Sequence, residues 1–342
     1  MTASVIEHRR RRPVGRLDEA VYDTYQRWVG FWFSPADPAS LGLMRILVGG
    51  MLIYSHLVWG LDLPAFLGSD GWNSAELVRE IQKDQWNSSF WWSVPAESML
   101  TVHWWCIGIL VLFWIGFCTR VTSVLAFAIH VSYCQRAAMS NFGLDQIGGI
   151  LLMYLMIGPC GAVYSFDSLW RRFRLRRQAM RNGRLEYDSS APPSSSAGLA
   201  LRLIQVHYCV IYFFAATGKL QGESWWNGEA LWRAFANYEY QSADMTWLAW
   251  YPEVLQLMTH LAILWELSFA YLVWVRPLRP LVLTLGILIH LGIGAFMGMW
   301  TFGLMMIFGY IAFLKPETVR AVVERPIFFV LRRMRSGFSA LQ

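Results

Sequence analysis

The stretch "LALRLIQVHYCVIYFFAATGKL", from Leu199 to Leu220, decides the fold class. It is a mostly apolar run, and a helix of about 20 apolar residues spans the hydrocarbon core of a bilayer. The run ends on Lys219, and two tryptophans, Trp225 and Trp226, follow almost at once. A lysine at the edge of such a segment either anchors the helix at the membrane surface or acts as a base.

The composition of the whole chain supports a membrane protein. Of 342 residues, 56% are hydrophobic and only 15% are charged, against about 25% charged residues in soluble domains. Similar apolar runs recur along the sequence, so we predict an all-α integral membrane protein with a bundle of about eight transmembrane helices. The predicted spans are Ala39–Gly60, Ser98–Cys118, Val121–Met139, Leu144–Tyr164, Leu199–Leu220, Glu253–Val275, Leu281–Trp300 and Thr301–Leu314.

The positive charges predict the topology. The formal net charge is +6, which alone is compatible with nucleic-acid binding. Most of the 29 lysines and arginines, however, fall in segments that eight spans place on one side of the membrane. Because cytoplasmic loops are enriched in lysine and arginine, both termini are predicted in the cytoplasm and no nucleic-acid partner is expected. "RRRR" at Arg9–Arg12 precedes no hydrophobic segment, so no signal peptide is predicted.

Three parts are predicted along the chain, namely 1–38, 39–314 and 315–342. The first is a cytoplasmic or interfacial segment in which Val21, Tyr25 and Trp28 have helical spacing, as in helices that lie in the membrane interface. The second is the transmembrane domain, divided by a basic inner loop at 165–198 that contains a Pro/Ser linker. The third is a basic cytoplasmic tail.

Polar residues within the spans are the candidates for function, because ionisable groups are costly in a membrane. Tyr208, Tyr212 and Lys219 lie four and seven residues apart on one helix stripe, where they could form a polar lining with the Trp225–Trp226 loop. Snorkelling of Lys219 to the interface is the structural alternative. The position of the residue alone favours that alternative.

Three further positions stand out. Glu266 lies about 20 Å into the sixth span. A carboxylate at this depth has either a structural partner on another helix, for which Arg45 is a candidate, or a catalytic role. His260 lies on the same helix but is turned away from Glu266. His290 shares a face with Gly286, Gly294 and Gly298, so it is expected to point into protein. Asp145 opens the fourth span, where a carboxylate also caps a helix N-terminus.

No metal site is predicted. The five cysteines form no close pair with metal-ligand spacing and are interpreted as small buried apolar residues. His56, His103, His130 and His207 are scattered, one to a span, and no HExxH motif or carboxylate cluster is present.

The ordered motifs resemble those of one family. They are "PASLGLMRIL" at Pro38–Leu47, "GSDGW" at Gly68–Trp72, "YFFAATGKLQGESWWNG" at Tyr212–Gly228, "ELSFAYLV" at Glu266–Val273 and "ILIHLGIGAFM" at Ile287–Met297. In these motifs, in their order and in their positions within the spans, the chain resembles the horizontally transferred transmembrane (HTTM) domain. This domain is the module shared with vitamin K-dependent γ-carboxylase. The resemblance covers most of the chain and implies a place in a bacterial cytoplasmic membrane.

The resemblance also implies roles for individual residues. Lys219 matches the lysine that acts as the base on a reduced quinone, which then reacts with O₂ so that a glutamate can be carboxylated by CO₂. His290 and Glu266 match the family's histidine and acidic residue in the seventh and sixth spans. A lysine can serve in this way if its surroundings lower its pKa from about 10.4.

Two departures leave the function open. The carboxylase carries a large lumenal domain after its spans, whereas a short basic tail follows the last span here, and the stretch from Lys219 to Gly228 is one residue longer. One hypothesis is therefore an enzyme with Lys219 as the base on a lipid-soluble quinol. The other is a non-catalytic membrane protein for peptide maturation, immunity or binding of a secreted peptide. A transporter is a weaker third, because no inverted repeat is visible.

Overall fold

The computed structural model describes residues 16–68, 71–83, 88–184 and 188–325. These residues form an all-helical structure without a β-strand, apart from one isolated bridge between Ala36 and Ser194. The main helices are α1 (Arg16–Phe33), α2 (Ala39–Trp59), α5 (Met99–Ile115), α6 (Thr119–Arg136), α7 (Gly143–Ile157), α8 (Phe166–Arg181), α9 (Ser195–Lys219), α12 (Pro252–Leu272), α13 (Arg279–Met297) and α14 (Trp300–Gly309). Short helices α3 (Leu63–Leu67), α4 (Ala75–Ile81), α10 (Glu223–Trp226) and α11 (Ala230–Phe235) lie in the connections.

Five of the described helices are long and apolar enough to cross a membrane. They are Ala39–Leu67, Ala96–Ile115, Ser195–Lys219, Pro252–Leu272 and Arg279–Met297, and each coincides with a span predicted from the sequence. The helix pair Trp300–Phe313 and Pro316–Arg325, bent by 120°, gives a sixth if it is counted as one span.

The structure thus supports fewer than the eight predicted spans by length and composition. α7 has 15 residues, which is about 22 Å of helix against a hydrocarbon core of about 30 Å. α6 begins and ends with polar residues, including Arg120 and Arg136, so its apolar part is short. α14 has only 10 residues before the 3₁₀ turn Tyr310–Phe313.

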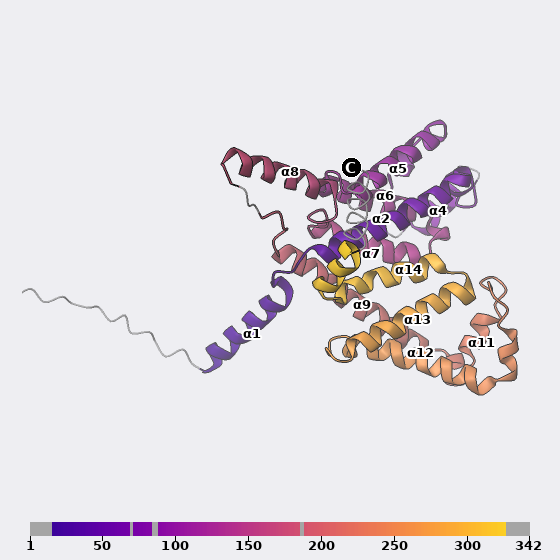
Figure 1. Ribbon diagram of the computed structural model, residues 1–342. Helices are drawn as coiled ribbons and strands as arrows, with labels where there is room; N and C mark the ends of the chain where they lie inside the picture. Colours follow the sequence, from indigo (N-terminus) through magenta and orange to yellow (C-terminus); the bar gives the residue numbers. More distant parts are fainter. Residues whose placement is uncertain (1–15, 69–70, 84–87, 185–187, 326–342) are drawn as a thin grey trace, which may run out of the picture.

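The helices form two groups that meet along α7, α9 and α14 (Figure 1). In the first group α2 packs on α5 and α6 packs on α7; in the second α9 packs on α12 and α13 packs on α14. α7 and α14 contact each other, and both contact α9. The largest buried cluster runs through both groups, so they share one core.

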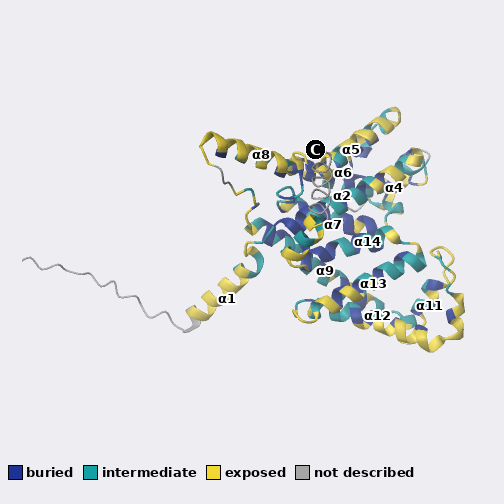
Figure 2. Cartoon of the chain, in the orientation of Figure 1, coloured by how far each residue is buried: buried dark blue, intermediate teal, exposed yellow. Residues whose placement is uncertain are grey.

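Two amphipathic helices lie outside this core. α1 and α8 extend away from the other helices (Figure 1), and both are largely exposed (Figure 2). In α1 the predicted stripe of Val21, Tyr25 and Trp28 is exposed. The basic half of the predicted loop at 165–198 is not a loop but the helix α8, because Ser165 caps its first turn by accepting the Ser168 N–H at 2.9 Å.

Arg45 is a buried arginine that joins three chain segments. Its side chain has no exposed surface, and it donates to the carbonyl oxygens of Cys160 at 3.2 Å and Phe113 at 2.9 Å. It also donates to the carbonyls of Trp114 and Tyr164. The prediction that Arg45 is the partner of Glu266 is therefore wrong: Arg45 instead joins the end of α5 to the turn after α7 through their carbonyl groups.

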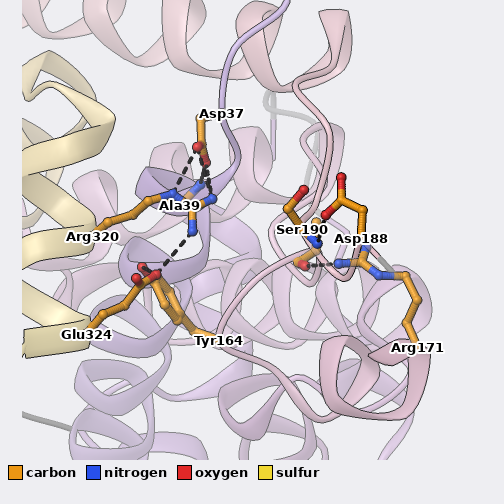
Figure 3. Close-up of polar contacts among 9 residues, drawn as sticks. Asp37, Ala39, Tyr164, Arg171, Asp188, Ser190, Arg320 and Glu324 are labelled. Atoms are coloured by element: carbon orange, nitrogen blue, oxygen red, sulfur yellow. Dashed lines mark hydrogen bonds and ion pairs between the residues drawn. The ribbon is translucent and has the colours of Figure 1, made fainter. Parts of the chain in front are cut away.

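A second polar cluster connects segments that are far apart in sequence (Figure 3). Arg320 donates to the Asp37 carboxylate, with Nε 3.0 Å from Oδ2, and to Glu324 Oε1 at 3.1 Å. Tyr164 donates to the same oxygen of Glu324 at 3.0 Å. Asp37 also accepts the N–H of Ala39 at the start of α2. The beginning of α2, the turn after α7 and the helix Pro316–Arg325 are thus held together.

At the opposite end of the bundle, Arg136 holds the connection between α2 and α5. It is 3% exposed and donates to the carbonyls of Leu67, Gly68 and Asn73. Its guanidinium also lies 5.1 Å from the ring centroid of Trp92, within the range of a cation–π interaction. This connection is therefore packed against α6.

Candidate functional site

The candidate site lies where α9 ends against the middle of α12. Lys219 is the last residue of α9, and its Nζ is 2.6 Å from both carboxylate oxygens of Glu266. The side chains are 27% and 15% exposed. The Lys219 side chain is therefore directed toward the Glu266 carboxylate. Glu266 was predicted to need a partner, and Lys219 is that partner.

The surroundings of the pair are aromatic. Lys219 Nζ lies 5.3 Å from the ring centroid of Trp225, so the ammonium group has a cation–π contact in addition to its ion pair. Trp226 is 66% exposed and donates from Nε1 to the Leu220 carbonyl at 2.8 Å. Of the two predicted loop tryptophans, Trp225 covers the lysine and Trp226 lies at the surface.

Deeper in the same half of the bundle, three side chains form a hydrogen-bonded group. Tyr212 Oη lies 2.7 Å from His290 Nε2 and also bonds to the Tyr310 hydroxyl. Tyr212, His290 and Tyr310 are 3%, 4% and 3% exposed. Tyr212 stands two helical turns below Lys219 on α9, so the Lys219–Glu266 pair and this tyrosine–histidine group lie along one side of the helix.

The face of α13 that contributes His290 to this tyrosine–histidine group agrees in part with the prediction. Gly286, His290 and Gly294 are buried on one face of α13, as expected. A Cβ atom at Gly286 would lie 2.5 Å from the Tyr310 hydroxyl, so the small residue is required for this approach. Gly298 is not part of the face, because it ends the helix with a φ of 71°.

Tyr208 is placed differently from the prediction. It has no exposed surface, and its hydroxyl lies 3.5 Å from the Met305 carbonyl. A Cβ atom at Gly309 would overlap the Tyr208 ring. Tyr208 therefore packs in the core against α14 and does not line an open pocket.

An apolar cavity of about 520 Å³ lies between α12 and α13. Its lining includes Phe235, Trp265, Ser268, Ile289 and Phe296, but neither Lys219 nor Glu266. Trp265 forms the wall toward the candidate site: its ring is 4.9 Å from that of Tyr212, and its Nε1 donates to the Val282 carbonyl at 3.1 Å. The cavity and the polar group are thus neighbours on two sides of one tryptophan.

Two other predicted residues lie outside this site. His260 is exposed, and its Nε2 is 3.2 Å from the Trp226 carbonyl, so it supports the loop. Asp145 begins α7 in the other half of the bundle, where its carboxylate accepts the Phe142 N–H at 3.0 Å. The predicted capping role of Asp145 is confirmed, and the residue does not meet Lys219.

Tyr310 and Trp265 were missed in the sequence. Both stand in predicted spans, but nothing in their own neighbourhood distinguishes them from the other aromatic residues of this chain. Their contacts with Tyr212 depend on how α12 and the turn after α14 pack on α9, which the sequence does not show.

The long apolar helices and the charged pair held between two of them indicate a membrane-embedded helical protein. No protein-family model, curated protein or solved structure matches the chain. The resemblance to the HTTM domain therefore stays a prediction from the sequence motifs.

Proposed function

We propose that this chain is an HTTM-like membrane protein related to the membrane module of vitamin K-dependent γ-carboxylase, in which Lys219 acts as a base on a lipid-soluble quinol. The observation that supports this most is the Lys219–Glu266 pair, with 2.6 Å contacts to both carboxylate oxygens at the end of α9. A lysine that only anchored the helix would extend to the interface. Here it turns to a half-buried carboxylate beside a buried tyrosine–histidine group.

The chemistry proposed for this pair is a proton transfer. The ammonium group of Lys219, whose side chain is 27% exposed, first releases a proton to water. The neutral amine then takes the proton of a quinol hydroxyl, so an O–H bond breaks, an N–H bond forms, and a quinolate and an ammonium group result. The carboxylate of Glu266 is placed to stabilise that ammonium group. By resemblance, the quinolate would then react with O₂, and CO₂ would be the second co-substrate.

The apolar cavity between α12 and α13 suits the hydrophobic part of such a substrate. Its volume of about 520 Å³ falls in the range of small-molecule sites, roughly 300–1,000 Å³. Trp265 separates the cavity from the Tyr212–His290–Tyr310 group, so a substrate that reaches both would have to displace this side chain. In this arrangement His290 and the two tyrosines are positioned to bond to oxygen atoms of a substrate head group.

The proposal is tested by the substitution Lys219→Arg. Arginine keeps a positive charge beside Glu266 but remains protonated, so it cannot accept a proton. Purified wild-type protein in lipid is expected to show quinol-dependent oxygen uptake, and Lys219→Arg is expected to lose at least about 100-fold of it, the lower end for general-base catalysis. Yield and membrane insertion should not change.

Lys83→Arg is the matched control, since it makes the same exchange in the connection between α4 and α5, away from α9. It should retain full oxygen uptake. Full turnover by Lys219→Arg would contradict the role as a base. A wild type that turns over no hydroquinone but retains a secreted peptide would favour the non-catalytic alternative.

The exposed aromatic residues around α10–α12 support that second candidate: Trp226, Tyr238, Trp247, Trp250 and Tyr251.

The proposed topology has eight spans, with both termini in the cytoplasm of a bacterial cell and Lys219 at the outer end. In this arrangement α6, α7 and α14 cross together with the five long helices as a packed bundle. Reporter fusions after Glu97 and after Gln221 are expected to report the outside, and a fusion after Gly183 the cytoplasm. An outside signal after Gly183 would contradict the arrangement.

A further inference from the structure

The first half of the bundle contains a second group of polar side chains, between α6 and α7. His130 and Cys134 lie one turn apart on α6, and Asp145 lies in the first turn of α7. One ring nitrogen of His130, the Cys134 thiol and a carboxylate oxygen of Asp145 all lie within 4.8 Å of one another. His130 and Asp145 are 4% and 8% exposed, and Cys134 is half-buried.

The close approach of α6 to α7 is built into the sequence. A Cβ atom at Gly148 would lie 3.2 Å from His130 Nε2, so glycine leaves room for the ring. His130 Nε2 lies 2.8 Å from the Asp145 carbonyl oxygen and 3.7 Å from Cys134 Sγ. The Phe142 N–H holds the Asp145 carboxylate at 3.0 Å. Backbone groups therefore hold the His130 ring and the Asp145 carboxylate, and the Cys134 thiol lies against the His130 ring.

His56 adds an independent observation. Its Nδ1 lies 2.8 Å from the Leu52 carbonyl oxygen, which only accepts, so Nδ1 carries the proton. The other nitrogen, Nε2, then carries a lone pair, and it is buried without a hydrogen-bond partner among the described residues. The His56 ring is 4% exposed and its centroid is 6.2 Å from that of His130. A histidine held by a carbonyl on one nitrogen, with the other free, is the usual state of a metal ligand.

We propose that this group binds a divalent transition-metal ion of the zinc type, with His130, Cys134 and Asp145 as ligands. His56, which lies outside this group of three, would move toward the ion to supply the fourth donor. Imidazole, thiolate and carboxylate together favour Zn²⁺ over Mg²⁺ or Ca²⁺, which select oxygen ligands. The thiolate and the carboxylate supply two negative charges. They balance the charge of the ion, so the occupied site is neutral and compatible with burial.

Binding requires two proton changes. Cys134 releases its thiol proton, and His130 moves its proton from Nε2 to Nδ1 if Nε2 is the ligand. The Asp145 carbonyl then loses one hydrogen bond but keeps the bond that its place in α7 provides. The ion would join α6 to the start of α7, in the half of the bundle that does not contain Lys219. This site is therefore independent of the proposed quinol chemistry.

Cobalt is the probe that tests this site, because tetrahedral Co²⁺ with a thiolate ligand has visible d–d bands and a near-ultraviolet charge-transfer band. Tag-free, full-length protein in detergent is treated with a chelator and titrated with Co²⁺. We expect one ion per chain with both kinds of band, and loss of both when Zn²⁺ is added. Cys134→Ser should remove the charge-transfer band and weaken Co²⁺ binding at least about tenfold.

Cys209→Ser is the matched control, since Cys209 is also half-buried but lies on α9. It should leave the spectrum and the stoichiometry unchanged. His56→Gln tests the fourth donor and should shift the d–d bands while the charge-transfer band remains. No saturable uptake of Co²⁺, or a charge-transfer band that persists in Cys134→Ser, would overturn the proposal.

Discussion

Replacing Arg45 by methionine is expected to lower the apparent melting temperature of the purified protein by at least about 5 °C, which corresponds to roughly 3 kcal/mol or more. Methionine has a similar length and fits an apolar core, so the effect would come from lost hydrogen bonds. Arg45 donates to four carbonyl groups and has no exposed surface. Phe113 and Trp114 lie in the last turn of α5, where a positive charge is favourable.

Two variants separate this role from a general effect of charge. Arg120→Met removes an exposed arginine near the same end of the bundle and should change the melting temperature by about 1 °C or less. Arg45→Lys should fall between wild type and methionine, since one ammonium group cannot donate to all four carbonyls of the two segments. The transition can be followed by circular dichroism in detergent. Equal melting temperatures for Arg45→Met and Arg120→Met would contradict the role assigned to Arg45.

The boundaries of the long helices could be predicted because each depends on local sequence. α2 begins at Ala39, as predicted, where Pro38 is followed by an apolar run. α13 begins at Arg279, two residues before the prediction, because Pro280 fits the first turn of a helix. α8 was missed since its many arginines were interpreted as a basic inner loop, although Ser165 and the spaced aromatic residues also indicate a capped amphipathic helix.

The partners of the polar residues could not be predicted in the same way. Lys219 and Glu266 are 47 residues apart and lie on different helices, and a single sequence contains no measure of which helices pack together. The physical requirement that Glu266 have a partner was correct, but the choice of Arg45 was not. Similarly, the i, i+4 spacing of His130 and Cys134 is visible in the sequence, whereas the approach of Asp145 depends on the turn between α6 and α7.

Glu266→Gln is expected to destabilise the protein by about 2 kcal/mol, because it leaves the Lys219 ammonium without a counter-charge. The value lies below the ~3–5 kcal/mol found when a fully buried pair is broken, since the Lys219 side chain is 27% exposed. Glu229→Gln is the matched control, because it breaks a surface ion pair with Arg233. The side chains of Arg233 and Glu229 are 66% and 51% exposed. That change should cost no more than about 0.5 kcal/mol.

Exchanging both residues, as Lys219→Glu together with Glu266→Lys, separates stability from catalysis. The swapped pair again places an ammonium beside a carboxylate at the junction of α9 and α12, so the melting temperature should recover most of the loss caused by Glu266→Gln. Quinol-dependent oxygen uptake should stay absent, because the amine now starts from the middle of α12 and no longer from the end of α9 beside Trp225. Recovery of both properties would show that only the charge pair matters and would contradict Lys219 as a positioned base. Recovery of neither would contradict the ion pair as the stabilising contact between the two helices.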